Sequence, residues 1–142
     1  MKSITKEFTF DMAHRLYDPS LSQIENANVF GKCFNIHGHT YKLFVTVEGE
    51  LKNGMIINFV DLKSIVNHQV IDTFDHTILL TRGDPLCKDL KNHAVIINKP
   101  STCENQVDVI WDLLSPKLEQ IEVTLTEIKL YETPTSFCAR SK

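Results

Sequence analysis

The sequence predicts an α+β fold in which a four-stranded antiparallel sheet carries two helices on one face. Two observations predict it: some segments alternate apolar and polar residues, and others repeat apolar residues every three or four positions. These segments follow one another as strand, strand, helix, strand, helix, strand, with turn-forming residues between them. This order suits an antiparallel sheet that buries one face against helices.

The first strand is predicted over residues 3–16. Alternate positions from Ile4 to Leu16 are mostly apolar, and His14 falls on the same face. Residues 17–36 are polar and irregular, and we interpret them as a long loop. In a compact domain a loop of this length is often functional.

The second strand is predicted over residues 38–49. Alternate positions from Tyr41 to Val47 are apolar, and His39 shares their face. The dipeptide Asn53-Gly54 then indicates a tight turn, because both residue types tolerate a positive φ.

Two helices and two more strands complete the predicted fold. Apolar residues at helical spacing predict a first helix over about 59–72. A second helix begins near Ser101 or Thr102, either of which could cap its N-terminus. Short strands are predicted at 94–97 and over about 122–133.

The composition excludes several classes of protein. The chain has 142 residues, 42% hydrophobic and 23% charged, which suits one globular domain over 1–142. A net charge of −3 argues against nucleic-acid binding, and no apolar run approaches the roughly 18 residues of a membrane span. The N-terminus shows no signal peptide, and four cysteines without CxxC spacing favour reduced thiols in a cytoplasmic protein.

Three histidines form a candidate metal site. His37 and His39 stand two apart, so both imidazoles lie on one face of the second strand. If that strand pairs with the first, His14 joins them, and three neutral nitrogens with an open fourth position are typical of catalytic zinc. Gly38 is expected to let another backbone approach closely. The His-x-His pair alone is equally consistent with polar residues at a strand end.

Spacing alone leaves three interpretations of Cys33. It could be a fourth ligand in a closed structural zinc site, or an activated thiolate that acts as base or nucleophile beside the metal. It could also be an inert buried thiol. We expect the other cysteines to be inert, since none has comparable neighbours: Cys87, Cys103 and Cys138.

Two further positions carry acidic groups of interest. In Asp75-His76 the carboxylate could support proton transfer by the imidazole, although adjacent side chains on an extended chain point apart. Glu132 lies in phase with Ile128 and Leu130, where a carboxylate is costly unless it is paired. It could accept two N–H donors from a heterocyclic ligand, or it could lie in water beyond the strand end.

Short motifs occur in order along nearly the whole chain: residues 10–15 (FDMAHR), 33–41 (CFNIHGHTY), 54–59 (GMIINF), 75–76 (DH), 102–105 (TCEN) and 132–136 (ETPTS). Together they resemble the 6-pyruvoyl-tetrahydropterin synthase family, and most closely its branch that makes 6-carboxy-tetrahydropterin for queuosine. The resemblance implies a tunnelling fold (T-fold). It also implies a homohexamer built from two stacked trimers, with active sites between subunits.

The resemblance also implies roles for individual residues. The zinc ligands would be His14, His37 and His39. Cys33 would be the catalytic thiol rather than a ligand, with Asp75 and His76 as its proton relay. Glu132 would anchor the 2-amino and N3 edge of the pterin, and Thr102 and Glu104 would contact it from the turn before the second helix.

The implied reaction converts 7,8-dihydroneopterin triphosphate to 6-carboxy-5,6,7,8-tetrahydropterin, with loss of acetaldehyde and triphosphate. The short spacing between Cys33 and the His-Gly-His motif favours this branch, and so does the ETPTS ending. One alternative is a 6-pyruvoyl-tetrahydropterin synthase, and a remote one is a non-catalytic binding module with structural zinc. Lys32 and Arg15 are candidate phosphate contacts. The chain departs from the family pattern at Cys103, where Thr is frequent, and at Asn58, where Asp is common.

Overall fold

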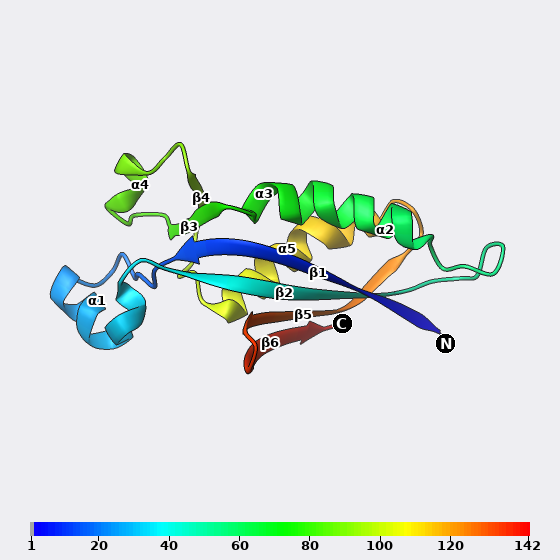
Figure 1. The fold of residues 1–142 in the computed structure, drawn as a ribbon, viewed down its shortest axis with the longest axis horizontal. Helices are drawn as coiled ribbons and strands as arrows, with labels where there is room; N and C mark the ends of the chain where they lie inside the picture. The colour runs from blue at the N-terminus through cyan, green and yellow to red at the C-terminus, as the bar shows by residue number, and fades with distance from the viewer. Residues whose placement is uncertain (1) are drawn as a thin grey trace.

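The computed structural model describes residues 2–142, which build one mixed sheet with helices packed against it (Figure 1). The spatial order of the six strands is β4-β3-β1-β2-β5-β6. In chain order the strands are β1 (Ser3–His14), β2 (His37–Glu48), β3 (Thr77–Thr81), β4 (Ala94–Ile97), β5 (Thr124–Thr133) and β6 (Ser136–Ser141).

The α+β class is confirmed, but the prediction of a four-stranded antiparallel sheet is wrong. The two strands it omits are β3 and β6, and β3 pairs in parallel with both β1 and β4. Residues 78–81 of β3 are all buried, so no polar alternation marks this strand. Strand β6 lies at the sheet edge with most of its residues exposed, so it lacks an apolar pattern.

Two long helical stretches lie on one side of the sheet, as predicted (Figure 1). The first joins α2 (Phe59–Val66), the π-helical turn η2 (Asn67–Ile71) and α3 (Asp72–Phe74), and the second is α5 (Cys103–Glu119). Pro116 falls in the last turns of α5 without ending the helix. Asn58 caps α2, since its Oδ1 accepts a hydrogen bond from the Val60 N–H at 2.8 Å.

Three shorter helical segments were not predicted: α1 (Gln23–Phe30), the 3-10 turn η1 (Gly31–Phe34) and α4 (Leu86–Asp89). Helix α1 and η1 replace the middle of the long loop expected over 17–36. Helix α1 has no apolar stripe, and its only buried residue is Asn26. A period of 3.6 residues therefore could not reveal it.

Strands β1 and β2 pair along their whole length, which gives the sheet one covered face and one open face. The covered face packs on the helices and includes Phe10, Met12, Tyr41 and Leu43, all buried. Each fully buried apolar side chain of this kind contributes roughly 1.5–3 kcal/mol to folding. The open face carries mostly polar side chains, such as Asp11, and most of them are exposed or half-buried.

The turn predicted after β2 is confirmed. Asn53 has φ 53° and Gly54 has φ 82°, and the flanking Lys52 and Met55 exchange backbone hydrogen bonds.

None of the helices within residues 2–142 combines the length and apolar character needed to cross a membrane.

Candidate active site

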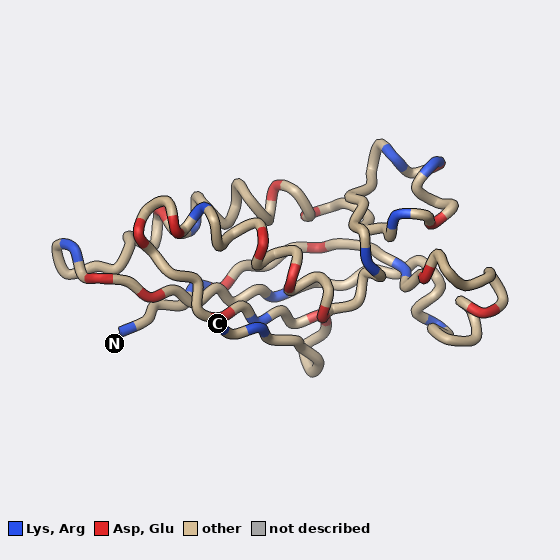
Figure 2. The backbone as a smooth tube through the Cα atoms, turned by 180° about the vertical axis from the view of Figure 1, so that it is seen from behind, with Lys and Arg blue, Asp and Glu red and all other residues tan. Residues whose placement is uncertain are grey.

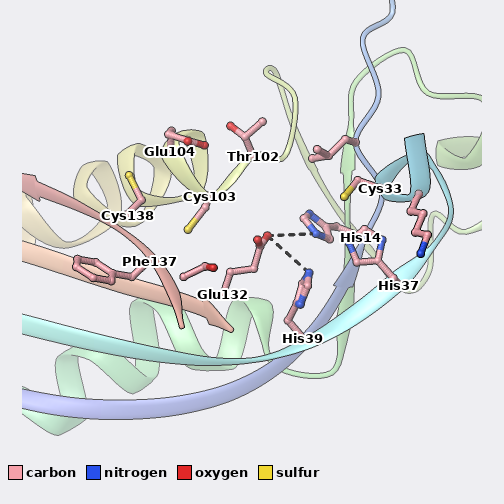
Figure 3. Close-up of a pocket in the computed structure, with 13 residues that line it drawn as sticks. His14, Cys33, His37, His39, Thr102, Cys103, Glu104, Glu132, Phe137 and Cys138 are labelled. Carbon is pink, nitrogen blue, oxygen red and sulfur yellow. Dashed lines mark ion pairs between the residues drawn. The ribbon is translucent and has the colours of Figure 1, made fainter. Parts of the chain in front are cut away.

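The pairing of β1 with β2 brings the three predicted histidines together. His14 lies opposite His37, and Met12 lies opposite His39, so all three imidazoles lie on the covered face. Ring centroids are 4.6 Å apart for His14 and His37, 4.9 Å for His37 and His39, and 5.3 Å for His14 and His39. One nitrogen from each ring lies within 4.8 Å of the others. Figure 3 shows the three rings facing one another.

Hydrogen bonds fix the tautomers of two of these rings. His14 Nδ1 donates to the Ser101 carbonyl at 2.9 Å, and His37 Nδ1 donates to the Asn35 carbonyl at 2.7 Å. The Nε2 atoms of both rings are therefore left as acceptors in the neutral form. Burial, reinforced by the neighbouring His37, lowers the pKa of His14 to about 4, so His14 is neutral at pH 7.

These residues fit a divalent cation. The buried Nε2 atoms of His14 and His39 have no hydrogen-bond partner within residues 2–142. Leaving such atoms unpaired is costly, and a bound cation would satisfy them. Glu132 Oε1 lies 3.5 Å from His14 Nε2 and 3.7 Å from His39 Nε2, so a carboxylate also faces the cluster. Three neutral imidazole nitrogens are a zinc-binding set with room for a further ligand.

A cavity of about 450 Å³ opens beside the histidines. Besides the histidines, its lining includes four residues for which the family resemblance implies a role, but not the Asp75-His76 pair: Cys33, Thr102, Glu104 and Glu132. Figure 3 shows Cys33 on one side of the histidines and Glu132 on the other, with Thr102 and Glu104 at the start of α5. Elements far apart in the sequence thus meet at one cavity.

The local fold explains where two of these residues lie. Thr102 is the N-cap of α5, and its hydroxyl accepts a hydrogen bond from the Asn105 N–H at 3.3 Å. Cys33 lies in η1, with its side chain exposed to the cavity, and its carbonyl accepts a 2.8 Å hydrogen bond from the Leu16 N–H.

The predicted relay pair is not at this cavity. Asp75 Oδ1 accepts a 2.9 Å hydrogen bond from the Asp11 N–H, which largely accounts for the lowered pKa of Asp75. His76 Nδ1 lies 2.9 Å from the same carboxylate oxygen, and its side chain is 78% exposed. The Asp11 side chain lies on the open face of the sheet, whereas the His14 side chain lies on the covered face. The Asp11 carboxylate clusters with Asp75 and His76. Within one chain the sheet therefore separates the pair from Cys33.

Two other expectations are wrong. A Cβ on Gly38 would meet only the Met12 carbonyl, at 3.8 Å, which is ordinary contact, so Gly38 permits no unusually close approach. Arg15 is not free to bind phosphate, because Asp84 holds it through Nε at 2.8 Å and Nη2 at 2.6 Å. Lys32 does line the cavity.

Some polar groups around the site were not predicted. Gln106 donates from Nε2 to the Ser101 carbonyl at 2.8 Å and to the Tyr41 hydroxyl at 3.3 Å. Burial raises the pKa of Tyr41, so its phenol stays neutral. The one sequence feature that could have indicated this network is Gln106 itself, a polar residue next to Val107 in the apolar stripe of the second helix.

Cys103 also lines the cavity. Burial, and then the charge of Glu132, raises the pKa of this thiol to about 12. Its Sγ donates to the Leu130 carbonyl at 3.4 Å. Cys103 is therefore protonated at neutral pH.

The fold and the cavity together define a class: an α+β protein in which three convergent imidazoles share a pocket with a thiol and a carboxylate. The family model described as 6-pyruvoyl tetrahydropterin synthase matches residues 3–142. The chain belongs to this family of pterin-metabolising synthases.

Curated relatives carry two different names. The chain is 38% identical over 135 residues to the 6-pyruvoyl tetrahydrobiopterin synthase of Drosophila melanogaster, covering 92% of this chain and 74% of that protein. It is 35% identical over 150 residues to the 6-carboxy-5,6,7,8-tetrahydropterin synthase of Haemophilus influenzae, covering 97% of each.

Solved structures agree with the family assignment. The 6-pyruvoyl tetrahydropterin synthase of Caenorhabditis elegans superposes with a TM-score of 0.74 at 28% identity, over 99% of this chain and 95% of that one. An uncharacterised protein of Wolinella succinogenes has the same fold, with a TM-score of 0.81 at 22% identity over 99% and 98% of the two chains.

Proposed function

We propose that this chain is a zinc-dependent 6-carboxy-5,6,7,8-tetrahydropterin synthase of queuosine biosynthesis. It would convert 7,8-dihydroneopterin triphosphate and water to 6-carboxy-5,6,7,8-tetrahydropterin, acetaldehyde and triphosphate. The observation that carries the proposal is that the three imidazoles, the Cys33 thiol and the Glu132 carboxylate line one cavity. A purely structural metal site would not explain why a carboxylate, Glu132, lines the same cavity.

The cavity offers complementary groups to a pterin triphosphate. Its volume of about 450 Å³ falls in the range of small-molecule sites. Glu132, half-buried, can accept two N–H donors from the 2-amino and N3 edge of the ring. Thr102 and Glu104 flank that edge from α5, and Lys32 at the lining supplies a cation for the phosphates.

His14, His37 and His39 would hold the zinc ion, which supplies Lewis-acid polarisation of the substrate side-chain oxygens when bound. Glu132 orients the ring so that the reacting carbons face Cys33. The Cys33 thiolate takes up and returns protons between the ring and the side chain. Triphosphate leaves after enolisation, and carbon–carbon cleavage then releases acetaldehyde.

The relay pair would serve the site of a neighbouring copy. Asp75 and His76 lie on the open face, so a second chain must supply them if they are to reach a Cys33 thiol. The sheet has edges through which copies could join. Residues 3–11 of β1 have no strand partner on the side away from β2 within residues 2–142, and β6 is an edge strand. These edges are consistent with the homohexamer of two stacked trimers that the family resemblance implies, and we propose that assembly, with sites between subunits.

Mixed oligomers test the shared site. Cys33→Ala and His76→Ala chains are each expected to be inactive alone. Co-expressed, they would form some sites with an intact Cys33 from one chain and an intact His76 from the other, and turnover would return in part. If each pure variant is inactive and the mixture remains so, although mass spectrometry shows mixed oligomers, the relay does not cross between chains.

The product decides between the two branches. The short spacing from Cys33 to the His-Gly-His motif supports the 6-carboxy product, and the Haemophilus influenzae relative matches over the whole of both chains. The Drosophila melanogaster relative supports the alternative, a 6-pyruvoyl product. The enzyme is incubated with 7,8-dihydroneopterin triphosphate, and products are analysed by mass spectrometry. Accumulation of the 6-pyruvoyl compound without acetaldehyde would establish the alternative.

The remote alternative, a single-domain binding module with structural zinc, has its own test. Cys33→Ala is expected to abolish turnover while one zinc per chain remains. Loss of zinc together with unfolding would make Cys33 a structural ligand instead.

We also propose a cytoplasmic location. It is supported by the four cysteines, all of which are free in the described chain.

A further inference from the structure

Cys33 has no hydrogen bond from its thiol to any group within residues 2–142, so other contacts must hold its position. Its carbonyl is tied to the Leu16 N–H at 2.8 Å. The next residue, Phe34, presents its ring to the Arg15 guanidinium, whose Cζ lies 4.8 Å from the ring centroid. The segment that carries the thiol is therefore anchored to the two residues that follow His14.

The Arg15 side chain is itself held from several directions. Its Cζ lies 5.1 Å from the Tyr17 ring centroid and 4.8 Å from the Phe34 ring centroid, and these two rings stack on each other with centroids 6.4 Å apart. Asp84 binds the guanidinium through two hydrogen bonds, from Nε at 2.8 Å and from Nη2 at 2.6 Å. Planar guanidinium is suited to both interactions at once, because its edge pairs with a carboxylate while its faces stack on aromatic rings.

Asp84 is placed to be a rigid partner. Its side chain is completely buried, and its Oδ1 also accepts the Leu86 N–H at 2.9 Å, which fixes it to the start of α4. A buried carboxylate is stable as an anion only when it is paired, so Arg15 and Asp84 constrain each other. The pair thus links the Cys33 segment to the loop that follows β3.

The same short segment also carries a predicted metal ligand. Ser101 accepts from His14 Nδ1 through its carbonyl, and its hydroxyl donates to the Arg15 carbonyl at 3.0 Å. Consecutive residues therefore face three partners: His14 faces the histidine cluster, Arg15 faces Asp84 and Phe34, and Leu16 binds the backbone of Cys33. The distance from the thiol to the imidazoles depends on how firmly this segment is held.

We propose that Arg15 and Asp84 are positioning residues that set the Cys33 thiol against the three-histidine cluster. This inference rests on the proposed function for the role of Cys33 in turnover, but the positioning itself concerns structure alone. A displaced thiol should slow proton transfer, while binding of the pterin ring should persist, because Glu132 and the start of α5 lie on the other side of the cavity (Figure 3). Lys32, the proposed phosphate contact, shares the η1 turn with Cys33, so a smaller loss of triphosphate affinity should accompany the effect.

The test compares Arg15→Lys with Arg140→Lys. Lysine keeps the charge but loses the planar fork. Arg140 is a matched control, because it also pairs with an aspartate, Asp108 at 2.7 Å, and stacks on an aromatic ring, Trp111 at 4.6 Å, away from Cys33. We expect Arg15→Lys to lower kcat by about tenfold to a hundredfold with little change in zinc content, and to raise KM by a smaller factor, since Lys32 shares the η1 turn with Cys33. Arg140→Lys should leave kcat nearly unchanged.

Hydrogen–deuterium exchange provides a readout that does not require turnover. In Arg15→Lys, exchange over residues 31–36 should accelerate by about tenfold or more, while α5 stays protected. If Arg15→Lys does not fold, Phe34→Leu removes the stacking ring while leaving the Arg15–Asp84 pair, and the same local acceleration is expected. Unchanged exchange over 31–36, or acceleration spread evenly along the chain, would overturn the positioning role.

The two proposals can fail separately. If the wild-type protein does not turn over 7,8-dihydroneopterin triphosphate, the proposed function fails, and the exchange result alone decides the positioning role. If the wild type is active but Arg15→Lys has the same kcat as Arg140→Lys, the positioning role fails and the proposed function stands.

Discussion

The covered face and the open face of the sheet carry polar groups of different kinds. On the covered face, the Nε2 atoms of His14 and His39 are buried and have no hydrogen-bond partner among the residues that the structure describes. On the open face, His76 is 78% exposed and already paired with Asp75. Figure 2 shows acidic and basic residues distributed along the backbone, with several basic residues at the end that holds α4 and the loop between β3 and β4. One chain thus gathers three imidazoles that could hold a metal on the covered face and holds the predicted relay pair on the open face.

The largest effect should follow from removing a histidine of the covered face. His37→Ala leaves two imidazoles, so metal affinity should fall at least about a hundredfold and turnover should be lost. Metal content per chain is measured by atomic emission after dialysis. His93→Ala, an exposed histidine outside the cluster, is the control. Full retention of the metal by His37→Ala would remove this residue from the site.

The matching change on the open face should separate chemistry from metal binding. His76→Ala is expected to lower kcat by about 10²–10⁴, the usual contribution of a general acid or base, with metal content unchanged. The two quantities are measured on the same preparation. Loss of metal from His76→Ala would show that the two faces are not independent.

Two of the three cavity thiols, Cys33 and Cys103, should differ in reactivity. With a pKa raised to about 12 from the ordinary 9, Cys103 has a thiolate fraction at pH 8 that is about a thousandfold lower than usual. Its alkylation by iodoacetamide should therefore be very slow and should rise about tenfold per pH unit toward pH 12. Peptide mapping by mass spectrometry follows both thiols, with the exposed Cys33 as the internal reference. Rapid alkylation of Cys103 at pH 8 would contradict its burial.

Glu132 tests ligand recognition on the covered face. Glu132→Gln replaces one acceptor oxygen by a donor, so neopterin binding should weaken about tenfold to a hundredfold, as for a lost charge-assisted hydrogen bond. Fluorescence titration measures the Kd. Glu127→Gln, five residues earlier on β5, is the matched control. Equal Kd values for the two variants would argue against a pterin-anchoring role.

The smallest effect should come from a site remote from both groups. Asn58→Ala removes the N-cap of α2 and should lower the free energy of unfolding by about 1 kcal/mol, with kcat unchanged. Asn58→Asp should restore the stability, since Asp caps helices about as well. Urea unfolding measures the difference. A loss of turnover in Asn58→Ala would give this residue a role beyond capping.

Strand periodicity predicted the site better than it predicted the sheet. Alternation correctly placed His14, His37 and His39 on one buried face, because β1 and β2 each have one wet and one dry side. It could not find β3, which is buried almost throughout, or β6, which is mostly exposed. Alternation of apolar and polar residues reveals a strand only when one face is buried and the other is exposed. Neither β3 nor β6 has two such different faces.

The meeting of distant segments was also beyond sequence periodicity. Nothing in the sequence around Asp84 indicates that it pairs with Arg15. The pairing depends on how the loop after β3 folds back to β1. Nor could spacing show that Asp75-His76 lies on the open face. That placement follows from a hydrogen bond to the backbone of Asp11, 64 residues away in sequence. The family resemblance supplied a role for this pair but not its position in one chain.

Strand alternation also constrains how such a sequence can change over generations. A single inserted or deleted residue between Phe8 and His14 would move that histidine to the opposite side of the sheet and bury a polar neighbour instead. Residues 17–30 include no strand, so a change in the length of this segment would move no side chain across the sheet and should be tolerated more often. Natural variation in length should therefore collect in this segment, while β1 and β2 tolerate substitutions but not gaps.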